Sequence, residues 1–181
     1  MTYYERNLPH WQPPGKDLFV TWRISGSLPL AVLETLRKNQ SLPSGKQFLH
    51  FDRHLDKHVF GPVWLKDPRL AQLVVAALKN SQTQGLCILH AFVVMPNHVH
   101  VLLEPGAELK EITRAVKRES ARAANAILGR TGKPFWQDES FDHWIRNSAQ
   151  LERVRTYIEQ NPVSAGLVKR PCDWPWSSAA Q

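Results

Sequence analysis

The sequence predicts an α+β domain built on an antiparallel sheet, and the strand-like runs and their spacing are the main reason. Bulky β-branched and aromatic residues form such runs at 18–24, 86–95 and 98–104. Only Pro96 and Asn97 separate the second run from the third, which favours an antiparallel hairpin because parallel strands need a long crossover. Helical patterns lie between and after these runs, and this mixture around a hairpin is typical of the α+β class.

Helices are predicted where apolar residues recur at helical spacing or where a start signal is present. The clearest start is Asp67 as the N-cap, with Pro68 at the first helical position. The last helix should begin at Ser148 as its cap and stop at Asn161, because Pro162 disfavours α geometry in the residue before it. The predicted helices are 29–39, 48–60, 67–81, 108–128 and 148–161.

The remaining segments show no regular pattern. The aromatic stretch "FWQDESFDHWIRN" at 135–147 is expected to be irregular. The Pro-rich start, about 1–17, is expected to be an N-terminal extension, and the end, about 171–181, a loop-like tail. The sequence contains no internal repeat, and a chain of 181 residues can bury one good core, so we expect 1–181 to form a single domain.

Composition argues against several classes of protein. The chain has no stretch of about 18 apolar residues and no signal-peptide pattern at its start, so we expect a soluble cytoplasmic protein. Cys87 and Cys172 stand alone and far apart, which argues against a disulfide framework or a cysteine-rich zinc site. The net charge of +7 favours a polyanionic partner, although such an excess also serves solubility alone. Charge leaves open whether that partner is DNA, RNA or a membrane.

Two histidines one residue apart, His98 and His100, lie in the third strand-like run. Residues two apart on a strand project from the same face, so the two imidazoles should lie side by side. Neutral imidazoles bind divalent metals, and a strand holds such a pair rigidly. A pair of histidines on the solvent face of a sheet is the structural alternative, and the pair alone does not exclude it.

Tyr157 and Asn161 lie four residues apart on the last predicted helix, and therefore on one helix face. With Leu151, Val154 and Ile158 as the buried stripe, Tyr157 falls at its edge and can reach a cleft between helix and sheet. Asn161 would offer a carbonyl oxygen beside it. The alternative is a packed tyrosine whose hydroxyl is in water.

Three motifs in this order resemble those of a known family: "MPNHVHVLLEP" at 95–105, "YIEQNPVSAGLV" at 157–168 and "DWPWSS" at 173–178. They are similar to the IS200-type tyrosine transposases of the HUH superfamily, most closely the REP-associated branch, over most of the chain. The resemblance implies a ferredoxin-like sheet and an enzyme that acts on single-stranded or hairpin DNA, as a monomer or homodimer, in the cytoplasm with the nucleoid.

The resemblance also implies residue roles. His98 and His100 would bind Mg²⁺ or Mn²⁺, opposite a helix that carries Tyr157 as the nucleophile. Asn161 stands where the insertion-sequence enzymes have a glutamine, and would be the third ligand, with water, Asp138 or Glu139 as alternatives. Attack by the phenol would leave a 5′-phosphotyrosine and a free 3′-hydroxyl. No histidine is an obvious base for the phenol, so its proton acceptor is not assigned.

Two other functions remain open at this point. One is a catalytically silent protein that binds nucleic-acid hairpins for regulation. The other is a two-histidine metallohydrolase that uses water, in which Tyr157 would be dispensable. Hairpin-forming, REP-like repeats are the substrates that the resemblance implies.

Candidate DNA contacts lie on the predicted helix 108–128 and among the tryptophans. A basic stripe of residues at four-residue spacing, with one neighbour, could follow phosphates, although a solvated helix face is the plain alternative. Tryptophans outside the predicted helices and strands could stack on unpaired bases, although burial is the commoner use. The stripe is Lys110, Arg114, Arg118 and Arg122 with Lys117 alongside; the tryptophans are Trp136, Trp144, Trp174 and Trp176.

A rival metal site is suggested by His50, His54 and His58, which recur every four residues with Asp52 and Asp56 between them. Three histidines along one straight helix seldom surround a small ion without another ligand, and the sequence has no HExxH pattern there. We expect these histidines to be surface residues.

Overall fold

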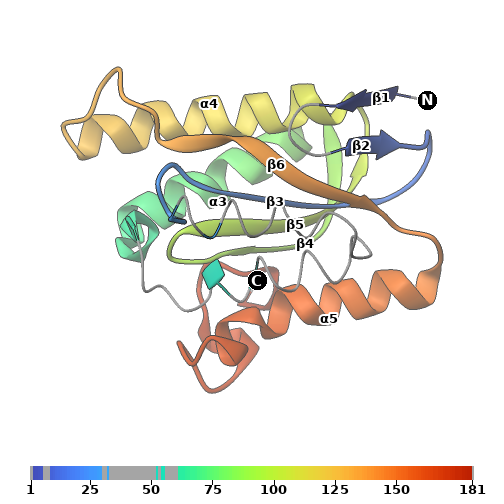
Figure 1. Ribbon diagram of the computed structural model, residues 1–181. Coiled ribbons are helices and arrows are strands. Elements are labelled where there is room, and N and C mark those ends of the chain that lie inside the picture. Colours follow the sequence, from blue (N-terminus) through green and yellow to red (C-terminus); the bar gives the residue numbers. More distant parts are fainter. Residues whose placement is uncertain are drawn as a thin grey trace.

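The computed structural model describes residues 2–5, 9–29, 32, 52, 54, 55 and 61–180, and the structural statements below concern these residues. Their centre is a four-stranded sheet of order β4-β5-β3-β6 in which every neighbouring pair is antiparallel (Figure 1). The strands are β3 (Leu18–Ile24), β4 (Cys87–Val94), β5 (His98–Pro105) and β6 (Trp136–Trp144).

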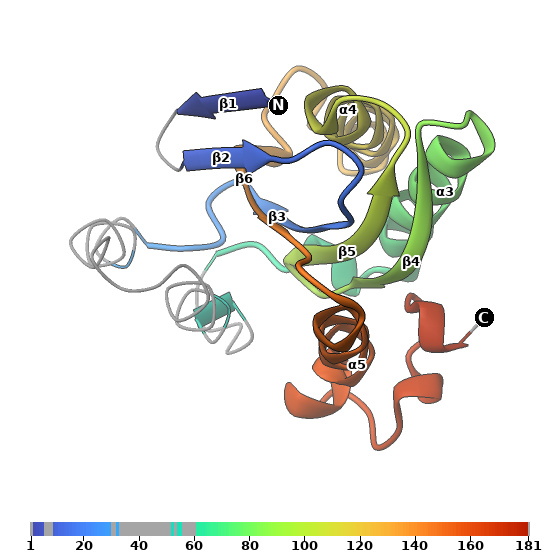
Figure 2. The same cartoon turned by 90° about the vertical axis from the view of Figure 1, so that its right-hand side faces the viewer.

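The long helices lie on the two faces of this sheet. They are α3 (Pro68–Thr83), α4 (Leu109–Ile127) and α5 (Ser148–Ser164). Helices α3 and α4 cover one face and α5 covers the other (Figures 1 and 2). Because α3 precedes the β4–β5 hairpin and α4 joins β5 to β6, the strand order gives the ferredoxin-like arrangement, as predicted.

Both faces of the two central strands are buried, so β3 and β5 have little solvent-facing surface. On β5, Val99, Val101 and Leu103 belong to the core under α3 and α4, whereas Leu102 belongs to the core under α5. The alternation of a strand therefore places His98 and His100 on the α5 side. Burial on both sides explains why the β4 and β5 sequences are almost continuously apolar.

The predicted start of α3 is confirmed, but both ends of α5 differ from the prediction. Asp67 accepts a hydrogen bond from the Arg69 backbone N–H at 2.9 Å. In α5 the cap is Asn147, not Ser148, since the Asn147 side chain accepts from the Gln150 N–H. The helix also continues through Pro162 to Ser164, so the predicted stop at Asn161 is wrong.

The expectation of an irregular segment at 135–147 is also wrong, because β6 occupies most of it. Its polar sequence has weak β propensity, but pairing with β3, from Leu18↔Trp144 to Ile24↔Trp136, supplies the backbone hydrogen bonds. A register shift between Trp22 and Ile24 interrupts the ladder. β6 is an edge strand of the sheet and most of its residues are half-buried, which tolerates such a composition.

The two ends of the chain contain structure that the sequence did not predict. Strands β1 (Thr2–Glu5) and β2 (Pro9–Gln12) form a small antiparallel sheet within the expected extension. The tail contains the short 3₁₀ helices η2 (Pro171–Asp173) and η3 (Ser178–Ala180). It lies along the free edge of β4, where the Val94 N–H donates to the Trp176 carbonyl at 2.8 Å (Figure 2).

The predicted helices 29–39 and 48–60 lie mostly outside the described residues. Val32, Asp52, His54 and Leu55 are described, and all four are helical. A further short 3₁₀ helix, η1 (Trp64–Lys66), precedes α3. Within the described part of the chain, no helix has the length and apolar character required to cross a membrane.

Candidate metal centre and nucleophile

Strand β5 brings the two histidines together as predicted. The Nε2 atoms of His98 and His100 lie 3.0 Å apart, and neither side chain has any exposed surface. Tyr157 and Asn161 come from α5, the helix that covers this face of the sheet. The alternative of a solvent-facing histidine pair is therefore wrong, because Asp52 and Asn161 of α5 lie against the two buried imidazoles.

Neighbouring polar groups fix the orientation of both rings. The Asn97 amide donates to the Leu55 carbonyl at 3.1 Å, so its oxygen faces His98 Nδ1, 2.7 Å away. An amide oxygen only accepts, which places the proton of neutral His98 on Nδ1 and leaves a lone pair on Nε2. His100 Nδ1 lies 2.7 Å from the Thr21 hydroxyl, so its Nε2 also points to the centre. Such partners behind the ligands are typical of metal-binding histidines.

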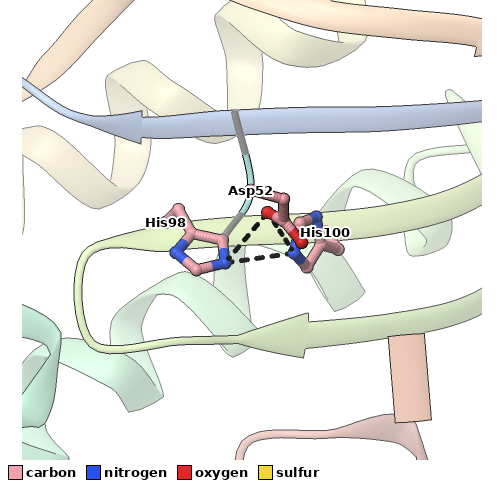
Figure 3. Close-up of side chains that lie close together, drawn as sticks. All are labelled: Asp52, His98 and His100. Atoms are coloured by element: carbon pink, nitrogen blue, oxygen red, sulfur yellow. Dashed lines mark hydrogen bonds and ion pairs between the residues drawn. The ribbon is translucent and has the colours of Figure 1, made fainter. Parts of the chain in front are cut away.

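Asp52 completes a three-residue cluster with the histidines (Figure 3). Its Oδ1 lies 3.2 Å from His100 Nε2 and 3.7 Å from His98 Nε2, and the side chain is buried. Burial raises the pKa of this carboxyl, but the effects of His100, His98 and Asn161 outweigh it, and the pKa lies below its ordinary value. Asp52 is therefore ionised at neutral pH.

The phenol of Tyr157 reaches this cluster within the same chain. Its hydroxyl donates a hydrogen bond to Asp52 Oδ2. The ring centroid lies 5.8 Å from that of His100, and Phe19 packs edge-on against the phenol at 6.2 Å. Tyr157 is half-buried, so its packed side lies against the core while part of the side chain remains accessible.

Asn161 lies at the cluster but does not direct its oxygen to it. Its amide nitrogen lies 3.4 Å from His100 Nε2 and 3.5 Å from Asp52 Oδ2. Its oxygen, like Asp52 Oδ1, is buried and accepts no hydrogen bond within the described part of the chain. Asp52, rather than the oxygen of Asn161, thus presents the third atom to the two imidazoles.

The residues present fit a divalent cation. The ligand atoms of Asp52, His98 and His100 all lie within 4.8 Å of one another. The two imidazole Nε2 atoms and the carboxylate oxygen lie at or near hydrogen-bond distance of one another, and a cation that displaces the proton between them would be held by all three. Two histidines with one carboxylate are also an established ligand set for divalent transition metals.

The other carboxylates considered as ligands do not join this cluster. Asp138 is exposed and Glu139 is half-buried, both on β6, and neither belongs to a described group with metal-ligand geometry that includes the histidines. His54 is half-buried rather than on the surface as expected. His50, His58 and Asp56 lie outside the described residues.

The predicted basic stripe is exposed but lies away from the cluster. Lys110, Arg114, Arg118 and Arg122 are all exposed on α4. Helix α4 covers the opposite face of the sheet from α5, so the sheet separates the stripe from Tyr157 (Figure 2). Lys117 is not a free member of the stripe, because its ammonium donates to the carbonyls of Gln137 and Asp138 on β6.

The tryptophans are less available for stacking than predicted. Trp136 is 6% exposed and its indole N–H donates to Ser120 Oγ at 3.0 Å, so the prediction that it stacks on bases is wrong. Trp174 is buried as well, with its N–H bonded to the Val94 carbonyl. Trp144 and Trp176 are half-buried.

Asp52 is the residue of the cluster that sequence reasoning missed. It was considered only as a neighbour of three histidines expected at the surface. One signal was available, since Asp52 follows Leu49 and precedes Leu55 by three residues and so shares their helix face. A carboxylate on an apolar helix face needs a buried partner.

Three comparisons show which known proteins this chain is similar to. Residues 63–161, more than half of the chain, match the family described as "Transposase IS200 like". The REP-associated tyrosine transposase of Escherichia coli (strain K12) is 32% identical over 93 residues, which are 50% of this chain and 53% of that protein. The chain thus spans about half the length of the curated relative it matches.

A solved structure of a REP-associated tyrosine transposase bound to a REP hairpin has a TM-score of 0.57 with this fold. The match covers 98% of this chain and 82% of that chain at 20% identity, and it supports the fold. The family match spans α3, the histidine strand β5 and the helix positions of Tyr157 and Asn161. The chain belongs to the IS200-like transposase family.

Proposed function

We propose that this chain is a metal-dependent single-strand DNA endonuclease and strand transferase of the REP-associated type, with Tyr157 as its nucleophile. The observation that carries the proposal is the convergence of the Tyr157 hydroxyl, Asp52 and the two imidazoles at one point. These side chains come from distant segments of the chain, and a purely structural role gives no reason for a phenol to meet a metal-ligand cluster.

Tyr157 would attack the phosphorus of a phosphodiester through its phenolic oxygen. The new ester would be a 5′-phosphotyrosine, and the P–O3′ bond would break to release a 3′-hydroxyl. A phenol has a pKa near 10 and is a weak nucleophile at neutral pH, so it needs positioning and a proton acceptor. Asp52 Oδ2 already accepts the phenolic hydrogen bond and is the atom placed to take that proton.

His98, His100 and Asp52 would hold the cation, Mn²⁺ or Mg²⁺. When bound, it would polarise the scissile phosphate and offset the charge that develops there. Asp52 would then use its two oxygens differently, Oδ1 toward the cation and Oδ2 toward the phenol. Asn161 lies one helical turn from Tyr157, and its amide nitrogen would contact the Asp52 carboxylate from the α5 side.

For the substrate we propose DNA hairpins similar to REP elements, because the E. coli relative is named for that association. The exposed stripe on α4 is separated from Tyr157 by the sheet, so it would hold a hairpin stem rather than the scissile phosphate. A protein with this activity would act as one domain, 1–181, on chromosomal DNA in the cytoplasm, bound to the nucleoid.

The test is a covalent-adduct assay with a labelled DNA hairpin that carries a single-stranded flank. With Mn²⁺ or Mg²⁺, the wild-type protein should give a species that resists denaturing electrophoresis. Tyr157→Phe should abolish it and retain hairpin binding, and His100→Ala should abolish it as well. Absence of the adduct with either metal, or an undiminished adduct in Tyr157→Phe, would reject the proposal.

The same assay separates the two other functions. Binding without any cleavage in the wild type would indicate a silent hairpin-binding protein. Cleavage that persists in Tyr157→Phe without an adduct would indicate a hydrolase that uses water. Neither is favoured, because the phenol, the carboxylate and both imidazoles stand together at one site.

A further inference from the structure

Arg23 lies beside the metal-ligand cluster, on the same face of the sheet. On β3 it pairs with His98, just as Thr21 pairs with His100. Directly paired residues of antiparallel strands project from the same face, and the Thr21–His100 hydrogen bond of 2.7 Å shows this for the neighbouring pair. The Ile24 N–H donates to the Asn97 carbonyl at 2.8 Å, which fixes this end of β3 against the residue that precedes His98.

The Arg23 side chain is almost fully buried, and the N–H donors that it does not direct to Ser27 still reach solvent. The residue is 6% exposed and is the one Lys or Arg among the described residues that is buried. Its side-chain contact is a long hydrogen bond of 3.4 Å to Ser27 Oγ, and no described carboxylate lies within 4.0 Å of it. A guanidinium has five N–H donors, so most of them have no protein partner among the described residues.

Such a group is costly for the folded protein. Burial lowers the pKa of Arg23 to about 10, which still leaves the side chain charged at neutral pH. A buried charge without a counter-ion destabilises a fold, and natural proteins rarely keep one without a ligand for it. The described residues supply no counter-ion for this charge, and a bound anion would supply one.

We propose that Arg23 binds a phosphate of the DNA strand that enters the site, next to His98. This inference rests on the proposed function, which supplies a phosphodiester as the anion. A guanidinium binds two phosphate oxygens at once through parallel N–H donors, so it fixes the rotation of the phosphate as well as its position. Arg23 would thereby orient the strand for attack by Tyr157.

The first test needs no enzymatic activity. Inorganic phosphate, compared with sodium chloride of equal ionic strength in metal-free buffer, should raise the Tm of the wild-type protein by roughly 2–4 °C. The rise should disappear in Arg23→Met. Lys79→Met, an exposed site on α3 that loses the same charge, should respond like the wild type.

The second test compares stability with activity. Without phosphate, Arg23→Met should melt at the wild-type temperature or above it, because an unpaired buried charge has been removed. Its adduct yield should fall roughly 100-fold, in the range for loss of one preorganised donor to a reacting phosphate or carbonyl. Arg23→Lys keeps the charge without the planar pair of donors and should fall less, about tenfold.

The outcomes distinguish this inference from the proposed function. A phosphate response that is absent in the wild type, or equal in the wild type and Arg23→Met, overturns the role of Arg23 whatever the adduct assay shows. If Arg23→Met does not fold, the phosphate response of Arg23→Lys decides, and an undiminished response overturns the role. If the wild type binds phosphate through Arg23 but forms no adduct, the proposed function fails and the anion site stands.

Discussion

Asp52 and Asn161 are two candidates for one position beside His98 and His100, and the geometry favours Asp52. The carboxylate presents an ionised oxygen to both imidazoles, whereas Asn161 presents its amide nitrogen. A nitrogen that carries two protons cannot be a metal ligand. The two residues therefore predict different effects on metal affinity.

We expect Asp52→Ala to weaken Mn²⁺ binding about 100-fold or more and Asn161→Ala to weaken it less than about tenfold, since losing a ligand costs more than losing a neighbour of the ligands. Titration calorimetry with Mn²⁺ measures both. Asn125→Ala is a matched control for Asn161→Ala, because Asn125 is also a buried helix asparagine and lies on α4. The reverse ranking would show that Asn161 rotates its amide and supplies the ligand.

Sequence analysis predicted those residues of the site whose positions follow from the periodicity of a single strand or helix. His98 and His100 follow from the period of a strand, and Tyr157 and Asn161 from the period of a helix. Asp52 and Arg23 could not be assigned in this way. Their importance comes from the tertiary contacts of Asp52 and of β3 with β5, which no spacing along the chain encodes.

Among the elements, the C-terminal tail matters because β4 is an edge strand. The tail bonds to this edge at Phe92, Val93 and Val94, and Trp174 fills the core under α5. An uncovered edge strand is a template for pairing with another chain. The tail therefore both stabilises the sheet and protects its edge.

Deletion of residues 174–181 should lower the free energy of unfolding by roughly 3–5 kcal/mol, the usual cost of losing a buried tryptophan. It should also cause self-association through β4. Thermal unfolding and analytical ultracentrifugation measure the two effects. Deletion of residues 180–181 alone keeps the contacts of Trp174, Trp176 and Ser178 and is the control. A long deletion that is monomeric and equally stable would contradict this role of the tail.

The stripe on α4 gives a second prediction at this scale. Arg114→Gln with Arg118→Gln should reduce the salt dependence of hairpin binding, with the slope of log K against log salt falling by about 1.8 for two lost phosphate contacts. Lys66→Gln with Lys79→Gln removes equal charge from exposed positions outside the stripe. Equal slopes for the two double variants would show that α4 does not hold the stem.

Helices and strands were predicted well where the segment itself contains a residue pattern or a cap that defines it. Strand β3 was predicted at its observed bounds, and α3 from its cap. Strand β6 was missed because its pairing with β3 outweighs its polar composition. The end of α5 was misjudged because Asn161 keeps helical geometry before Pro162, and the helix ends at the C-cap Ala165, which Gly166 with φ of +70° follows.

For the molecule as a whole, the proposed function predicts that each chain uses its own Tyr157 with its own histidines. The Tyr157 hydroxyl bonds to Asp52 of the same chain, and α5 packs on the sheet that carries the histidines. A mixture of Tyr157→Phe and His100→Ala proteins should therefore form no adduct above the level of either alone. Recovery of a large fraction of wild-type adduct would show that α5 exchanges between two chains.

The central claim is that the phenol and the Asp52, His98 and His100 cluster act on one phosphodiester. The most direct measurement is mass spectrometry of the tryptic peptides of the isolated DNA adduct. The account predicts a 5′-nucleotide on Tyr157, in the peptide 156–169 between Arg155 and Lys169. A nucleotide on Tyr3 or Tyr4, the other two tyrosines of the chain, or on a residue of another type would contradict it.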